Sequence, residues 1–330
     1  AESLKRQGKT TSAQMVEREF EKAWEKADTK LRVEDIAGTE SNAVRPLDRN
    51  TPSLRFADVR LKTGVRLHYA EQGDPAGNPV VLLHGYGDSW FSYSRVLPLI
   101  GANHRVYVLD LRGHGDSDRP TSGYKFSDFA ADVLAFMDAK GLKSATVVGH
   151  SMGSFVAQHV AVAAPDRVAR LVLIGAATTP RNATVLGLQR EVSALSDPIP
   201  EKFAREFQSG MVYQKVPDDF IDKLVAESLK PPARVWRAVM AGMLAGDARS
   251  QLARIKAPTL IMWGDRETVF SRAEQDALVK AIPTAVFKEY KDVGHGGPHW
   301  ELPERFVQDL EEFIARSNLV TSSSSGPNSR

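Results

Sequence analysis

The stretch that decides the fold of this chain is ATVVGHSMGSFVAQHVAVAA, residues 145–164. Its first four residues predict a short buried strand, and residues 152–164 predict an apolar helix that ends before a proline. Between the two elements, Gly149 and Gly153 flank Ser151 in the pattern Gly-x-Ser-x-Gly. Glycines are needed where a strand turns sharply into a helix, and such a turn exposes the serine hydroxyl at the edge of a sheet. We therefore predict that Ser151 is a nucleophile.

Short apolar runs and helical patterns alternate on either side of this stretch. Runs that are apolar on both faces are typical of parallel strands with helices on both sides, so we predict a doubly wound α/β sheet. A hairpin at residues 56–69 opens it. The predicted strands are 79–83, 105–110, 145–149, 170–175, 258–263 and 285–290. The predicted helices are 127–140 with Ser127 as N-cap, 152–164, one opened by a capping box at Ser271 and Glu274, and one after Pro303.

Strand patterns are absent between residues 178 and 256, where prolines separate several predicted helices. We expect this segment to be a helical cap inserted into the sheet domain. The polar N-terminal part contains one amphipathic pattern, at residues 12–30, and the Ser-rich C-terminal end predicts a disordered tail. The predicted parts are an N-terminal extension (1–53), an α/β core (54–177 and 257–318), the cap (178–256) and the tail (319–330).

The composition narrows the classes of partner. Among 330 residues, 43 Lys and Arg oppose 41 Asp and Glu, and the net charge of +2 does not favour nucleic acid or a membrane surface. No apolar run approaches the roughly 18 residues that span a bilayer. The absence of cysteine excludes disulfides, a thiolate nucleophile and Cys-ligated metal sites. The start at Ala1 without an apolar signal segment fits either simple processing or removal of a signal peptide. We expect a small-molecule substrate.

A serine nucleophile needs a base, and the chain has eight histidines. His295 lies in a glycine-rich loop after the last predicted strand, from which it could reach Ser151 across the carboxyl edge of the sheet. His299 is a rival in the same loop. A carboxylate must orient the base, and the Trp-Gly-Asp-Arg-Glu loop after the preceding strand offers Asp265 and Glu267. Either of them satisfies the chain order Ser, acid, His.

The chemistry also requires donors for a developing oxyanion. The sequence His84-Gly85-Tyr86-Gly87 follows the predicted strand that ends at residue 83. We predict that the backbone N–H groups of Tyr86 and Met152 form the oxyanion hole. His84 is expected to be a structural hydrogen-bonding residue.

These loops together resemble the α/β-hydrolase superfamily over residues 54–317, including Leu-Asp-Leu-Arg-Gly-His-Gly-Asp-Ser at 109–117. The resemblance implies the α/β-hydrolase fold and a serine hydrolase of the capped branch. It favours Glu267 over Asp265 as the acid, because the acid usually stands three positions after the glycine of Trp-Gly; glutamate departs from the commoner aspartate. Relatives that open epoxides or remove halide use aspartate at the elbow, so Ser151 argues against both reactions. The segment with Arg112 and His114 is expected to be a structural turn.

The function predicted from these residues is hydrolysis of a carboxylic ester or lactone through an acyl-enzyme on Ser151, without metal or cofactor. One alternative is a carbon-carbon bond hydrolase or perhydrolase with the same three residues. An alternative of another class is a receptor-like protein that uses the pocket to hold a ligand. The residues predicted to line the substrate pocket are Trp90, Phe91, Trp236 and Met240.

Overall fold

The computed structural model describes residues 53–322, with side chains described as far as residue 316. The predicted N-terminal helix at residues 12–30 lies outside the described residues, as do residues 323–330. The chain divides by contacts into residues 1–51 and 52–330, and the fold that follows belongs to the second unit.

Eight strands form one sheet in the order β1-β2-β4-β3-β5-β6-β7-β8. The β1 and β2 strands form the predicted antiparallel hairpin, β2 is antiparallel to β4, and every later pair is parallel. The prediction of a mostly parallel α/β sheet is therefore confirmed. The strands are β1 (Arg55–Arg60), β2 (Arg66–Gly73), β3 (Asn78–Leu83), β4 (His104–Leu109), β5 (Ala145–His150), β6 (Val168–Ile174), β7 (Thr259–Gly264) and β8 (Ala285–Tyr290).

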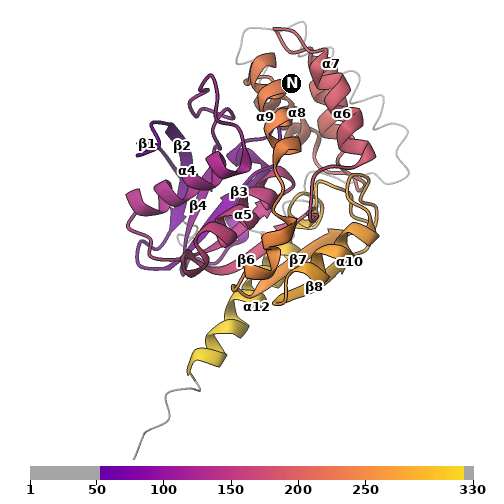
Figure 1. The fold of residues 1–330 in the computed structure, drawn as a ribbon. Helices are drawn as coiled ribbons and strands as arrows, with labels where there is room; N and C mark the ends of the chain where they lie inside the picture. Colours follow the sequence, from indigo (N-terminus) through magenta and orange to yellow (C-terminus); the bar gives the residue numbers. More distant parts are fainter. Residues whose placement is uncertain (1–52, 323–330) are drawn as a thin grey trace, which may run out of the picture. The chain divides into compact units, whose positions relative to one another are not determined.

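Both faces of the sheet are covered, because successive side chains of a strand point to opposite faces. On β5, Val147 joins a core cluster with Phe129 and Val156, and Val148 joins a second cluster with Leu310. The first cluster includes residues of α4, α5 and α10, and the second includes residues of α12 (Figure 1). These helices and one short neighbour are α4 (Phe126–Ala139), α5 (Met152–Ala163), α10 (Arg272–Ala281), α11 (Pro298–Glu301) and α12 (Pro303–Ser322).

Four helices lie between β6 and β7 in the sequence, in the segment where we predict a cap. They are α6 (Ala183–Ser193), α7 (Glu201–Ser209), α8 (Asp218–Ser228) and α9 (Ala233–Ala245). Prolines 200, 217 and 232 stand at the N-caps of α7, α8 and α9, where a residue without an N–H costs no helical hydrogen bond. Figure 1 shows the four helices gathered together at the top of the view.

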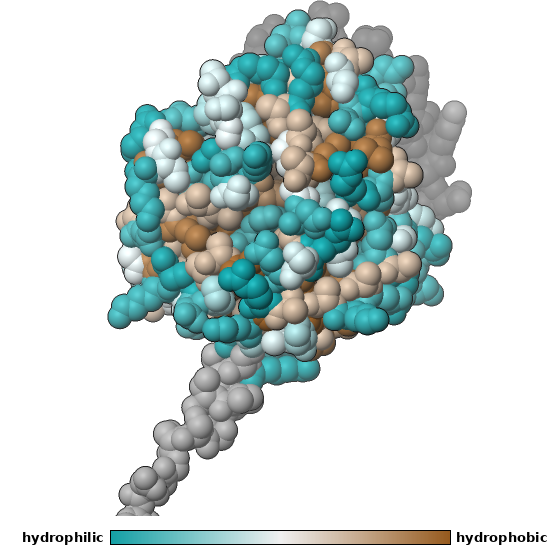
Figure 2. Space-filling model, in the orientation of Figure 1, coloured by the Kyte–Doolittle hydropathy of each residue, from teal (hydrophilic) through white to brown (hydrophobic). Residues whose placement is uncertain are grey.

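Four 3₁₀ helices complete the described fold: η1 (Trp90–Tyr93), η2 (Leu97–Leu99), η3 (Pro165–Arg167) and η4 (Arg249–Arg254). Hydrophilic residues cover most of the face shown in Figure 2, with hydrophobic ones interspersed. No helix among the described residues is long and apolar enough to cross a membrane.

The predicted start of one helix was wrong. Helix α4 begins at Phe126 with Lys125 as N-cap, rather than at Ser127, because the Asp128 carboxylate accepts the Lys125 backbone N–H at 2.9 Å. Helix α12 continues to Ser322, into the first residues of the predicted tail. The capping box at the start of α10 is confirmed, since Glu274 Oε2 accepts the Ser271 backbone N–H at 2.7 Å.

Candidate active site

Ser151 stands between β5 and α5 in a strained backbone conformation, with φ 49° and ψ −117°. A non-glycine residue adopts positive φ rarely, and such strain concentrates at functional sites. The neighbouring glycines make the turn possible: a Cβ on Gly149 would lie 2.2 Å from the Gly153 carbonyl oxygen, and one on Gly153 would lie 2.3 Å from that of Leu83. The sharp turn therefore depends on glycine at both positions.

A chain of hydrogen bonds joins Ser151, His295 and Glu267, which follow β5, β8 and β7 respectively. His295 Nε2 lies 2.9 Å from Ser151 Oγ, and His295 Nδ1 lies 2.7 and 2.9 Å from the two Glu267 oxygens. A carboxylate only accepts, so Nδ1 carries the proton and Nε2 is left to accept the serine hydroxyl. The side chains of His295 and Glu267 are 4% and 1% exposed, which keeps water from competing with this pair.

Additional contacts hold Glu267 and direct Asp265 elsewhere. Glu267 Oε1 also accepts the backbone N–H groups of Val269 at 2.7 Å and Phe270 at 3.2 Å. Asp265 Oδ1 instead accepts the Asp292 backbone N–H at 2.6 Å. Of the two carboxylates that the sequence left open, the structure joins Glu267 to the histidine.

The two other candidate histidines have different surroundings. His299 is fully buried and packs against Tyr93 with the rings tilted and their centroids 4.8 Å apart, and neither ring nitrogen has a hydrogen-bond partner within residues 53–316. Burial lowers the pKa of His299 well below its usual range. His84 Nδ1 donates to the Gly85 carbonyl at 2.7 Å, and its Nε2 accepts the Leu111 backbone N–H at 3.0 Å. His84 thus holds two loops together.

The predicted oxyanion donors, Tyr86 and Met152, lie just after two neighbouring strands, β3 and β5. Leu83, which ends β3, pairs with Gly149 of β5, so the Tyr86 loop and the start of α5 leave the sheet side by side. No loop or turn hydrogen bond among the described residues uses the backbone N–H of Tyr86 or Met152 as donor. The Tyr86 hydroxyl donates to the Trp236 carbonyl at 2.6 Å, which turns that side chain toward α9.

Residues 78–302 match the family described as the alpha/beta hydrolase fold. The chain belongs to this family. It is 31% identical over 291 residues to 2-hydroxy-6-oxononadienedioate/2-hydroxy-6-oxononatrienedioate hydrolase 2 of Pseudomonas putida, covering 79% of this chain and 96% of the relative. It is 30% identical to the non-heme chloroperoxidase of Streptomyces lividans, covering 78% and 98%. A thermophilic esterase from Thermogutta terrifontis superposes with a TM-score of 0.70 at 25% identity, covering 80% and 99%.

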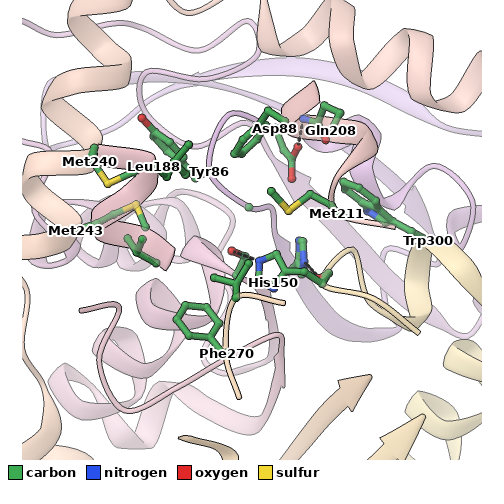
Figure 3. Close-up of a pocket in the computed structure, with 16 residues that line it drawn as sticks. Tyr86, Asp88, His150, Leu188, Gln208, Met211, Met240, Met243, Phe270 and Trp300 are labelled. Carbon is green, nitrogen blue, oxygen red and sulfur yellow. Dashed lines mark hydrogen bonds between the residues drawn. The ribbon is translucent and has the colours of Figure 1, made fainter. Parts of the chain in front are cut away.

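A pocket opens at Ser151 in this α/β hydrolase, with an empty volume of about 500 Å³ including the part open to solvent. Figure 3 shows Leu188, Met240 and Met243 on one side, and Asp88, Gln208 and Trp300 on the other. Its lining is mostly apolar: Gly85, Tyr86, Asp88, His150, Ser151, Val185, Leu188, Phe207, Gln208, Met211, Met240, Met243, Val269, Phe270, His295 and Trp300. Such a pocket suits a largely apolar small molecule.

Of the four residues predicted to line the pocket, the structure places only Met240 there. Trp90 packs edge-on against Phe56 of β1, with ring centroids 4.7 Å apart. Phe91 lies beside Phe220, with ring centroids 5.6 Å apart. Trp236 is 1% exposed because it fills the space behind Tyr86, at 4.7 Å. Trp236 therefore packs behind the pocket residue Tyr86, whereas Trp90 and Phe91 pack against other aromatic residues that do not line the pocket.

Three polar residues line the pocket although the sequence did not predict them there: Asp88, His150 and Gln208. Asp88 is 3% exposed and accepts Gln208 Nε2 at 2.8 Å; burial raises the pKa of Asp88 to about 7. His150 Nε2 donates to the His295 carbonyl at 2.9 Å, and burial lowers the pKa of His150 to about 3. Asp88 directly follows the His-Gly-Tyr-Gly loop and His150 directly precedes Ser151, so their positions in the sequence could have indicated that they lie at the pocket. No sequence pattern indicates this for Gln208, which lies in α7.

One group of side chains in the described region resembles a cation site. Ligand atoms of His68, Asp110 and Asp116 lie within 4.8 Å of one another. Internal bonds already use them, since Lys230 Nζ lies 3.0 Å from both Asp116 oxygens and Asp110 accepts the backbone N–H groups of Trp90 and Asp116. This group therefore belongs to the structural turn predicted around residues 112–117.

Proposed function

We propose that this α/β hydrolase is a serine hydrolase that cleaves a carboxylic ester or lactone through an acyl-enzyme on Ser151. The observation that carries the proposal is the hydrogen-bonded chain Glu267–His295–Ser151, which ends at a hydroxyl on the wall of an apolar pocket. Nucleophile, base and orienting acid within hydrogen-bond reach are the requirement for activating a serine.

The reaction would proceed in two halves. His295 Nε2 takes the Ser151 hydroxyl proton as Oγ bonds to the substrate carbonyl carbon, and the carbonyl oxygen becomes an oxyanion. The backbone N–H groups of Tyr86 and Met152 would stabilise that charge. The oxyanion then reforms the carbonyl, the alcohol leaves with the proton from His295, and the acyl group stays on Ser151. Water attacks the acyl group in the same way, with His295 as base, and releases the acid.

Glu267 acts through His295. Its negative charge favours the imidazolium that forms when His295 takes the proton, and the contact is strong because both side chains are shielded from solvent. The backbone N–H groups of Val269 and Phe270 fix the carboxylate before the reaction begins. Little reorganisation is then needed as the charge develops.

A second candidate reaction uses the same three residues to cleave a carbon-carbon bond or to make a peracid. It is supported by the names of the relatives from Pseudomonas putida, a hydrolase of an oxo-dienedioate, and Streptomyces lividans, a chloroperoxidase. The mostly apolar lining favours the ester or lactone reaction, because a dicarboxylate would need more cationic partners than the pocket supplies.

An organophosphonate probe tests the serine chemistry directly. Mass spectrometry should locate the added mass on Ser151, and the rate of labelling should fall by about a thousandfold or more in His295→Ala. His299→Ala is the matched control, because this buried histidine makes no hydrogen bond to the serine. Equal labelling of the wild type and His295→Ala would overturn the proposal.

Turnover then separates the classes of function. Steady hydrolysis of p-nitrophenyl esters and lactones would support the esterase. A receptor that only retains the three residues would stop after a single slow turnover. Faster consumption of a vinylogous dioxo acid than of any ester would instead support the carbon-carbon bond hydrolase.

A further inference from the structure

Two hydrogen-bond acceptors meet at one point of the otherwise apolar pocket wall. A Cβ built on Gly85 would lie 2.8 Å from Asp88 Oδ2 and 3.1 Å from His150 Nδ1. The two atoms therefore flank the same small volume next to Gly85. All three residues line the pocket that contains Ser151.

His150 Nδ1 is an acceptor because of the bond that the other ring nitrogen makes. Nε2 lies 2.9 Å from the His295 carbonyl oxygen, which can only accept, so Nε2 carries the hydrogen. Burial keeps the ring neutral. Nδ1 then presents a lone pair and has no hydrogen-bond partner among the described residues, although the side chain is 2% exposed. A buried acceptor without a donor is costly, so a donor from a bound molecule would be stabilised there.

Asp88 is held in place by a relay from two helices above the sheet. Gln208 Nε2 in α7 donates both to Asp88 Oδ1, at 2.8 Å, and to Ser228 Oγ in α8, at 2.7 Å. Ser228 Oγ donates in turn to the Gly87 carbonyl at 2.9 Å. Figure 3 shows the Asp88 carboxylate directed into the pocket with the Gln208 amide beside it. The relay fixes Oδ1 and leaves Oδ2 on the side of Gly85.

We propose that Asp88 Oδ2 and His150 Nδ1 form a subsite that binds a hydrogen-bond donor of the substrate, either a hydroxyl or an amide N–H. The substrate is then an apolar ester or lactone that carries one such donor. This inference rests on the proposed esterase or lactonase function, because it assigns a substrate class to the same pocket.

The subsite would select substrates because two buried acceptors favour a molecule that brings a hydrogen-bond donor to them. A substrate without the donor would displace solvent and bring no donor to Asp88 Oδ2 and His150 Nδ1 in an apolar surrounding, whereas a donor-bearing substrate supplies one. The apolar side formed by Leu188, Met240 and Met243 would accept the rest of the molecule. The pocket therefore combines broad apolar contact with one polar contact that fixes orientation.

The test uses matched sets of substrates on the full chain at about pH 8, where the Asp88 carboxyl is mostly ionised. One set consists of p-nitrophenyl hexanoate and its derivatives with a hydroxyl or a methoxy group at acyl carbon 2, 3 or 6. The other consists of butanoate esters of ethylene glycol and 1,3-propanediol with their methyl ethers. At least one hydroxyl compound should have a kcat/KM about tenfold or more above both its methyl ether and its unsubstituted parent.

Substitution locates the effect. In Asp88→Leu that preference should fall to about one, and it should be lost in Asp88→Asn as well, because the asparagine oxygen stays with Gln208 Nε2 and its NH₂ group, which only donates, replaces Oδ2. Asp116→Asn is the matched control, since this aspartate pairs with Lys230 outside the pocket, and it should retain the wild-type preference. The comparison of hydroxyl compounds with their methyl ethers and parents on the wild-type enzyme needs no variant. It therefore still tests the subsite if Asp88→Leu does not fold.

The outcomes distinguish this inference from the function on which it rests. Phosphonate labelling of Ser151 and turnover of the parent esters, without a preference for any hydroxyl compound, would overturn the subsite alone. A preference that survives in Asp88→Leu would overturn it as well. No labelling of Ser151 in the wild type would remove the proposed function together with the subsite.

Discussion

Replacing Glu267 with glutamine changes one atom of a buried side chain, and the structure predicts a large loss of rate. Glu267 Oε1 accepts the backbone N–H groups of Val269 and Phe270, whereas Oε2 makes the shorter contact, 2.7 Å, with His295 Nδ1. The oxygen of a glutamine must stay with the two backbone donors, so its NH₂ group would face His295. Nδ1 would then have to accept, and the ring would carry its hydrogen on Nε2.

In that tautomer His295 cannot take the proton from Ser151. Wrong-tautomer substitutions of the acid in serine proteases lower kcat by about 10⁴. We expect kcat for p-nitrophenyl butanoate to fall by about 10³ to 10⁴ in Glu267→Gln, which corresponds to about 4 to 5.5 kcal/mol of transition-state stabilisation. The KM should change little, because Glu267 does not line the pocket.

Asp265→Asn is the matched control. Asp265 Oδ1 accepts the Asp292 backbone N–H at 2.6 Å, and the oxygen of an asparagine can keep that bond. Its kcat should stay within about threefold of the wild type, and thermal unfolding should show that both variants are folded. A near-normal rate in Glu267→Gln, or a large loss in Asp265→Asn, would refute the assignment of the orienting acid.

Three further predictions concern stability. Gly153→Ala should destabilise the fold by about 3 kcal/mol in urea denaturation, because the new Cβ would lie 2.3 Å from the Leu83 carbonyl oxygen; an unchanged midpoint would contradict this. Asp88→Asn should gain stability relative to the wild type as pH rises from about 5 to 7. Burial raises the pKa of Asp88 to about 7, so in this range the folded wild type keeps a proton that the unfolded chain has lost, and its stability falls by about 1.4 kcal/mol per pH unit; parallel pH profiles of the two proteins would argue against it. His299→Phe should reduce acid lability below about pH 6.5, because burial lowers the pKa of His299 and only the unfolded wild type takes up that proton. Equal midpoints of acid unfolding for the wild type and His299→Phe would contradict this prediction.

Much of the core could be predicted because its signals are local. A buried parallel strand must be apolar on both faces, and β8 was predicted with its observed bounds, Ala285–Tyr290. The turn at Ser151 was predictable for the same reason, since neither Gly149 nor Gly153 has room for a Cβ. The α4 start was missed because the cap bond comes from Asp128, one residue beyond the serine that the pattern favoured.

The substrate pocket could not be predicted in this way. Its wall combines the loop after β3 with side chains of α6, α7 and α9, which are separated from that loop by about a hundred residues or more. An aromatic side chain that closely follows the predicted oxyanion loop in sequence, such as Trp90, can equally pack on Phe56 outside the pocket. Which apolar residue faces the cavity is a result of packing between segments.

The sequence by itself determined the strand-turn-helix position of Ser151, the succession of core strands and helices along the chain and two candidate acids, because these depend on strand, turn and loop signals within a few residues. Only the tertiary structure decided between Glu267 and Asp265, since the choice depends on which carboxylate meets a histidine 28 or 30 positions further along the chain. It also decided that Asp88 faces the pocket, held by Gln208 from a helix 120 residues away. Hydrogen bonds between distant segments exist only after the chain has folded, and local patterns do not encode their geometry.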